Sequence, residues 1–79
     1  MIRHRTRRSA RAALDRQPVN GFAVEVGAEN YTAALGRYFV THPTPRMWVL
    51  NDRERELNDP AHYGTIDSVL AVVFGTEVR

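Results

Sequence analysis

Apolar and polar residues alternate most clearly in residues 22–26, where Phe22, Val24 and Val26 occupy every second position. A two-residue period is typical of a half-buried β-strand. Glycine-containing turn segments stand on both sides of this stretch. The pattern predicts a strand here, with residues 31–32 folding back as a short antiparallel partner.

The spacing changes to a helical one in residues 33–41. Leu35, Tyr38 and Phe39 stand at positions i, i+3 and i+4, which places them on one face of a helix. His42 is predicted at the C-terminal end, where the helix dipole favours it. The prolines that follow directly cannot continue a helix, so the predicted helix ends there.

A second, stronger helical pattern occupies residues 65–75. Ile66, Val69, Leu70 and Val73 follow the i, i+3, i+4, i+7 spacing of one helix face. A threonine at the start of this segment is a suitable N-cap, and a glycine at its end is a suitable stop. Two further apolar residues widen the apolar surface beyond one face, so this helix is predicted to be well buried or to contact a partner.

Between these two patterns lies a compact apolar run at residues 47–50. Its composition predicts a strand. Residues 56–57 are predicted to return beside it across a charged turn at residues 52–55, which would form a charged hairpin.

The arginine-rich start of the chain predicts a short helix over residues 6–17. This segment is rich in strong helix formers, offers Thr6 or Ser9 as N-cap, and stops at Pro18. An extended segment, with alternating apolar residues up to Leu14 on one face, is the alternative.

Length and composition limit the chain to one small domain. It has 79 residues, of which 43% are hydrophobic and 25% charged, as is usual for globular proteins. With short links and no long βαβ connection, the elements predict an α+β fold, in which a small, mainly antiparallel sheet of two hairpins packs against two helices. We expect residues 18–79 to form the single α+β domain and residues 1–17 to be an Arg-rich N-terminal segment. A homodimer would add buried surface to so small a core.

Charge is distributed unevenly along the chain. Residues 1–16 contain six arginines and a single acid, Asp15, for a net charge of +5, whereas residues 17–79 contain five arginines and eight acids, for a net charge of −3. Guanidinium groups pair bidentately with phosphate and carboxylate groups. The first 16 residues therefore predict contact with a nucleic acid or an acidic protein, unless they only solvate the terminus.

Signatures of catalysis and metal binding are absent from the sequence. The three histidines lack the spacing of a zinc site, and the chain has no cysteine, no lysine for a Walker phosphate loop and no Gly-x-Ser-x-Gly. Asp52, Glu54 and Glu56 alternate with arginines, which suits a soluble hairpin edge better than acid–base catalysis. We expect no catalytic residue, metal or cofactor.

Neither a signal core nor a run of roughly 20 apolar residues, the length of a membrane-spanning helix, occurs in the sequence. No membrane partner is expected. The lack of cysteine fits a reducing compartment, and we expect a cytoplasmic location.

These observations predict a small non-enzymatic interaction module. Size and the strand–helix order resemble those of small mobile-element proteins such as anti-CRISPR inhibitors, without a shared residue motif. The resemblance implies a phage or mobile-element inhibitor that occupies the surface of a host nucleic-acid-processing or defence complex. A nucleic-acid-binding regulator and a toxin-type ribonuclease are the alternatives. The candidate partner-binding residues are Arg3, Arg5, Arg7, Arg8, Arg11, Asp52, Glu54 and Tyr63.

Overall fold

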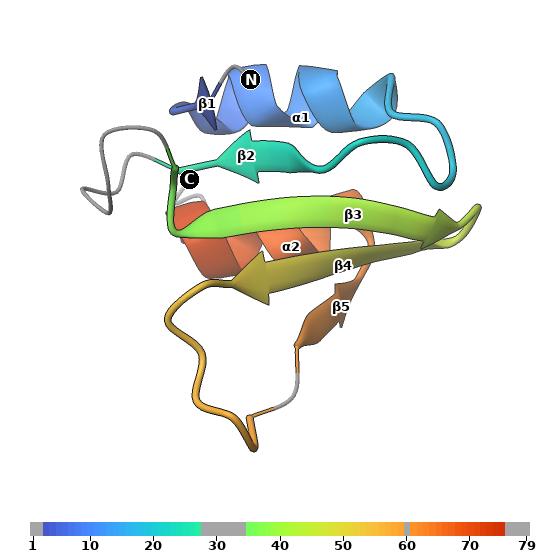
Figure 1. Cartoon of the computed structure of the whole chain (residues 1–79). Coiled ribbons are helices and arrows are strands. Elements are labelled where there is room, and N and C mark those ends of the chain that lie inside the picture. The colour runs from blue at the N-terminus through green and yellow to red at the C-terminus, as the bar shows by residue number, and fades with distance from the viewer. Residues whose placement is uncertain (1–2, 28–34, 60, 76–79) are drawn as a thin grey trace.

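Over the residues that the structure describes, the chain forms two helices and five short strands, arranged as in Figure 1. The structure, a computed structural model, describes residues 3–27, 35–59 and 61–75. In chain order the elements are β1 (Arg3–His4), α1 (Arg7–Asp15), β2 (Val24–Val26), β3 (Tyr38–Thr44), β4 (Met47–Asp52), β5 (His62–Gly64) and α2 (Ile66–Phe74). The predicted α+β class is confirmed. Neither described helix is long and apolar enough to cross a bilayer.

The five strands form one sheet in the order β1-β2-β3-β4-β5. The pairs β2–β3, β3–β4 and β4–β5 are antiparallel, as predicted for most of the sheet. β1 and β2 are parallel and connected through α1. The expectation that the fold lacks a βαβ connection is therefore wrong at the N-terminus, because the predicted elements did not include β1.

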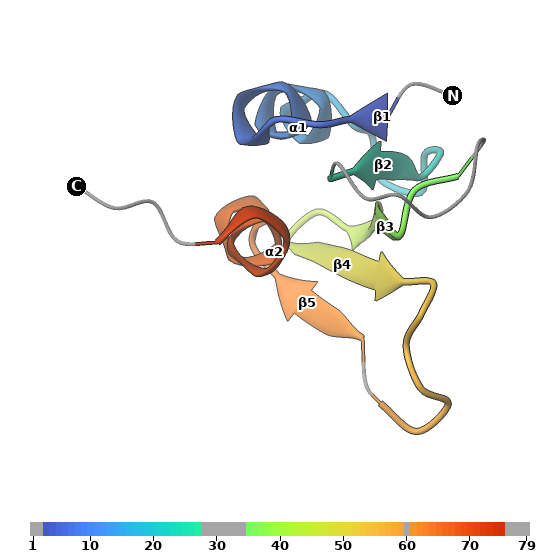
Figure 2. The ribbon, with the colours of Figure 1, turned by 90° about the vertical axis from the view of Figure 1, so that its left-hand side faces the viewer.

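Both helices pack against the same face of the sheet and against each other (Figure 2). Side chains from α1, α2, β2, β3 and β4 meet there to form the core. Its buried members are Ala10, Leu14, Val26, Val40, Leu50, Ile66, Val69 and Leu70. The N-terminal segment thus belongs to the domain, since α1 contributes two of these residues.

The two helices begin with the same capping arrangement. The Thr6 hydroxyl accepts a hydrogen bond from the Ser9 backbone N–H at 3.1 Å, and the Thr65 hydroxyl accepts one from Ser68 at 3.1 Å. Such caps satisfy backbone donors that the first helical turn leaves free. At the end of α2, Gly75 has φ of 82°, a conformation in which a side chain would be strained. The predicted N-terminal and C-terminal helices are both confirmed.

The predicted helix at residues 33–41 is wrong, because Tyr38–Thr44 is strand β3. Tyr38 and Phe39 point to opposite faces of the sheet and share no helix face. β3 lies between β2 and β4, so pairing on both sides outweighs the local helical spacing. A register shift between Thr41 and Thr44 accommodates Pro43, which cannot donate to the ladder. His42 is correspondingly a buried strand residue and does not end a helix.

The predicted charged hairpin is also wrong in its pairing. β4 pairs with β3 through a turn after Thr44 and, on its other side, with β5. Residues 53–59 form a loop, in which Leu57 is 96% exposed. β3 and β5 bring Val40 and the backbone of residues 62–64 beside Leu50, whereas residues 56–57 offer a single apolar side chain. The predicted strand at residues 31–32 lies outside the described residues.

Candidate functional site

The predicted partner-binding residues lie at two ends of the molecule (Figures 1 and 2). Arg3, on β1, and the four arginines that follow it lie at the α1 end. Asp52 and Glu54 lie at the end of β4 and in the loop that follows, and Tyr63 lies on the edge strand β5. The structure therefore does not bring the basic and acidic candidates together into one site.

Two of the arginines on α1 bind the other helix. Arg7 donates to the Gly75 carbonyl at 2.8 Å and lies 4.0 Å from the Asp67 carboxylate. Arg11 is ion-paired with Asp67 and lies 3.8 Å from Asp15. These contacts join α1 to both ends of α2, so Arg7 and Arg11 have a structural role.

The remaining arginines of α1 and its flanks face solvent. Arg5, Arg8 and Arg16 are exposed, and none of the three has an ion pair with another described residue. Arg8, Ala12 and Arg16 are spaced by four residues, so they lie on one side of the helix, opposite the buried Leu14. We call Arg5, Arg8 and Arg16 the basic patch.

The charges at the start of α1, the helix that carries the basic patch, do not stabilise the helix. The first turn of α1 contains no acidic residue, although the positive end of the helix dipole favours acids there. Arg7 and Arg8 occupy that turn instead. The dipole and the arginines therefore add to one positive potential, which is suited to a bound anion.

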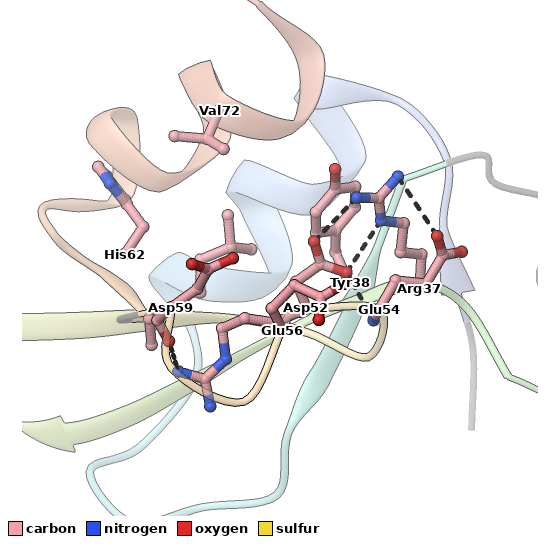
Figure 3. Close-up of a pocket in the computed structure, with 11 residues that line it drawn as sticks. Arg37, Tyr38, Asp52, Glu54, Glu56, Asp59, His62 and Val72 are labelled. Carbon is pink, nitrogen blue, oxygen red and sulfur yellow. Dashed lines mark hydrogen bonds and ion pairs between the residues drawn. The ribbon is translucent and has the colours of Figure 1, made fainter.

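At the opposite end, a pocket of about 290 Å³ opens between the start of β3, the end of β4, the loop of residues 53–59 and α2 (Figure 3). Its lining residues are Arg37, Tyr38, Leu50, Asp52, Glu54, Arg55, Glu56, Asp59, Ala61, His62 and Val72. Arg37 donates to both oxygens of Asp52 at 2.9 Å and lies 5.0 Å from the centre of the Tyr38 ring. The Arg37 hydrogen bonds hold the pKa of Asp52 below its usual value. Asp52 is thus already paired within the chain.

Three carboxylates of this pocket are exposed, and we call Glu54, Glu56 and Asp59 the acidic loop. Glu54 lies 4.0 Å from the Arg37 guanidinium. The Arg55 side chain donates to the backbone carbonyl of Asp59 and not to its carboxylate. Asp59 itself is exposed. The pocket is therefore lined by exposed acidic side chains and by apolar residues that include the buried Leu50.

The histidine of the pocket lies close to a serine hydroxyl. His62 Nε2 lies 2.8 Å from the Ser68 hydroxyl at an exposed position. No described carboxylate is hydrogen-bonded to this imidazole, and an activated serine needs a base that a third group orients. Within the described ranges, no three His, Asp or Glu side chains gather closely enough to hold a metal ion.

The other aromatic and histidine candidates take structural or surface positions. His42 is 7% exposed, stacks on Trp48 with ring centres 3.9 Å apart, and has Nδ1 3.2 Å from the Gln17 carbonyl. Tyr63 is 65% exposed and lies on the edge strand β5.

Sequence reasoning missed Arg16, Arg37 and Arg53. Arg16 had a usable signal, because Arg8, Ala12 and Arg16 follow one another at a spacing of four residues and so lie on the same side of a helix. Arg37 and Arg53 had none, since their partners Asp52 and Glu25 are 15 and 28 residues away in the chain.

Fold and site together define an α+β domain with a basic helix surface at one end and an acidic loop at the other. The chain matches no protein-family model, no curated protein and no solved structure. The functional inference is therefore based on the contacts and charges at the two ends of the molecule, the α1 surface and the acidic loop.

Proposed function

We propose that the chain is a small non-enzymatic interaction protein that binds the phosphate backbone of a nucleic acid through the basic patch. One observation carries this proposal: Arg5, Arg8 and Arg16 stay exposed and without a described acidic partner, while Arg7 and Arg11 are held by α2. Exposed arginines that do not serve the fold remain available to an external anion.

The spacing of the patch suits a polyanion. Arg8 and Arg16 are eight residues apart, which corresponds to about 12 Å along a helix. Each strand of a duplex advances about 3.4 Å per phosphate, so this length covers roughly three to four phosphates. Guanidinium groups can bind phosphate oxygens in pairs, and Ala12 between the two arginines leaves room for the backbone to approach.

Two variants with the same net charge test the proposal. One is Arg8→Gln with Arg16→Gln, and its control is Arg46→Gln with Arg55→Gln, which removes two exposed arginines away from α1. Binding is measured by fluorescence anisotropy with a labelled duplex and a labelled single strand over a range of salt concentrations. At about 50 mM salt we expect the first variant to bind at least about tenfold more weakly, with a salt slope smaller by about two.

The control should remain within about twofold of the unmodified protein, because its two exposed arginines lie outside α1 and its flanks. Equal losses in the two variants, or no binding of either probe at about 50 mM salt, would exclude the proposal.

The acidic loop supports a second candidate function. Glu54, Glu56 and Asp59 present three exposed carboxylates on a short loop, and such an array can occupy a cationic groove of a nucleic-acid-processing or defence complex. This would be the surface occupation of an anti-CRISPR-like inhibitor. Affinity capture from the source cell should recover a complex with the unmodified chain and with the Arg8/Arg16 variant. It should lose that complex with Glu54→Gln, Glu56→Gln and Asp59→Asn combined.

We place both functions in the cytoplasm, since a chain without cysteine suits a reducing compartment.

A further inference from the structure

The sheet has a second face, opposite the two described helices (Figure 2). Strand alternation puts Val40 and Leu50 in the core and their neighbours on the other side. We call this side the outer sheet face. On β3, β4 and β5 its residues are Phe39, Thr41, Val49, Asn51 and Tyr63.

Part of this face is closed by the chain itself. Glu25 on β2 is 1% exposed, and its carboxylate accepts from the Gly36 backbone at 3.0 Å and from Arg53 at 2.8 Å. Arg53 also donates to the Gly36 carbonyl at 2.6 Å. These contacts cover β2, whereas Phe39, Thr41, Val49 and Asn51 are half-buried and Tyr63 is exposed.

The same contacts fix Arg53 over an aromatic ring. Its guanidinium carbon lies 4.4 Å from the centre of the Phe39 ring. A guanidinium group held over an aromatic ring can itself stack on a base.

Tyr63 is a second aromatic group on the same face. It is opposite Val49, which is opposite Thr41, whereas Phe39 is two residues further along β3. From strand geometry, Tyr63 and Phe39 stand about 12 Å apart on a diagonal of the face. The side chains between them include the hydroxyl of Thr41 and the amide of Asn51, which lie 3.4 Å from each other.

We infer that the outer sheet face binds the bases of a single-stranded nucleic acid, with one base on Tyr63 and another on the Arg53–Phe39 stack. This rests on the proposed function and names its ligand class. The described residues of β3, β4 and β5 on this face include no carboxylate that would repel a polyanion, and the Glu25 carboxylate is paired with Arg53. A duplex keeps its bases stacked inside and offers no base surface to these side chains.

Fluorescence anisotropy with two probes tests the inference, using labelled 12-nucleotide oligothymidine and a labelled 12-base-pair duplex. The variants of the full chain are Tyr63→Ala and Tyr63→Phe. Phe22→Ala serves as the matched control, because Phe22 is 92% exposed but lies outside the sheet. Thermal unfolding by circular dichroism checks that each variant is folded.

We expect Tyr63→Ala to weaken binding of oligothymidine about tenfold and to leave the duplex unaffected. Tyr63→Phe, which keeps the ring, and Phe22→Ala should bind like the unmodified chain. If Tyr63→Ala binds oligothymidine like Phe22→Ala, the inference fails. It also fails if the chain forms a dimer by sedimentation that Tyr63→Ala dissociates, since a second copy would then occupy the face.

The arginine variant separates this inference from the proposed function. If Arg8→Gln with Arg16→Gln loses both probes while Tyr63→Ala loses neither, the basic patch binds nucleic acid and the outer sheet face does not. If the arginine variant binds both probes normally while Tyr63→Ala no longer binds oligothymidine, the outer sheet face binds nucleic acid and the basic patch does not. A chain that binds neither probe overturns both.

Discussion

Arg53 Nη1 lies 2.8 Å from the Glu25 carboxylate, across 28 residues of sequence. The Glu25 side chain is only 2% exposed, whereas that of Arg53 is 23% exposed. A buried carboxylate needs a charged or hydrogen-bonding partner to remain ionised. This pair therefore ties the loop after β4 to β2 and sets the shape of the outer sheet face.

Removal of Arg53 should destabilise the fold strongly. Arg53→Met removes the guanidinium that donates to the buried Glu25 carboxylate, and we expect a loss of about 3 kcal/mol of unfolding free energy. Arg55→Met, in the same loop but at an exposed position, should cost less than about 0.5 kcal/mol. Urea denaturation of both variants measures the difference. Equal losses would show that the ion pair does not support the fold, and the double variant Glu25→Gln with Arg53→Met should lose less than Arg53→Met alone.

Truncation of two leucines should change stability by very different amounts. Leu14 is 0% exposed and Leu57 is 96% exposed. Leu14→Ala removes apolar contacts between α1 and the core and should cost about 3 kcal/mol, whereas Leu57→Ala should change stability by less than about 0.5 kcal/mol. Thermal or urea unfolding measures both. A small effect of Leu14→Ala would mean that α1 is not part of the cooperative domain.

Loss of Asp67 should increase affinity for nucleic acid. Asp67→Asn removes the carboxylate that pairs with Arg11 and lies near Arg7, so less of the positive charge of these arginines is neutralised beside the basic patch. The Asp67 side chain is 57% exposed, and the loss of stability should stay below about 1 kcal/mol. Anisotropy titrations should show tighter binding and a salt slope larger by about one to two. Asp59→Asn changes the net charge equally at the other end, and an equal gain there would contradict the prediction.

Acid should destabilise the chain partly through Asp52. Hydrogen bonds from Arg37 lower the pKa of Asp52 in the folded state, so the unfolded chain takes up this proton at a higher pH. The contribution of Asp52 is therefore complete above the unfolded pKa of about 3.9 and is lost as the pH falls through the lower folded value. Urea midpoints measured from about pH 5 to about pH 2 should fall less steeply for Asp52→Asn than for the unmodified chain. Asp59→Asn is the control, and an identical slope in all three proteins would refute the prediction.

Elements governed by local signals were predicted well. Thr6 and Thr65 act as caps through hydrogen bonds to residues three positions away, and Ile66, Val69 and Leu70 bury one helix face as their spacing requires. The exposure of Tyr63 was also predictable from the turn-forming residues around it. These features depend on residues that are close to one another in the sequence.

Elements governed by distant partners were not predictable in the same way. Tyr38 and Phe39 have helical spacing with Leu35, yet β2 and β4 on either side make this segment a strand. The return of the chain beside β4 at His62, and not at Leu57, depends on the same sheet. Cross-strand hydrogen bonds and packing on two neighbours outweigh a local preference of a few tenths of a kcal/mol per residue.

The arginine-rich N-terminus shows the same division. The sequence by itself determined that this segment is strongly basic, and it favoured a capped helix over an extended segment. Only the tertiary structure decided which arginines remain available, because Asp67 and the Gly75 carbonyl lie on a helix about 60 residues away and bind Arg7 and Arg11. Charge is a property of each side chain, whereas exposure and pairing depend on which distant groups the fold brings within a few ångströms.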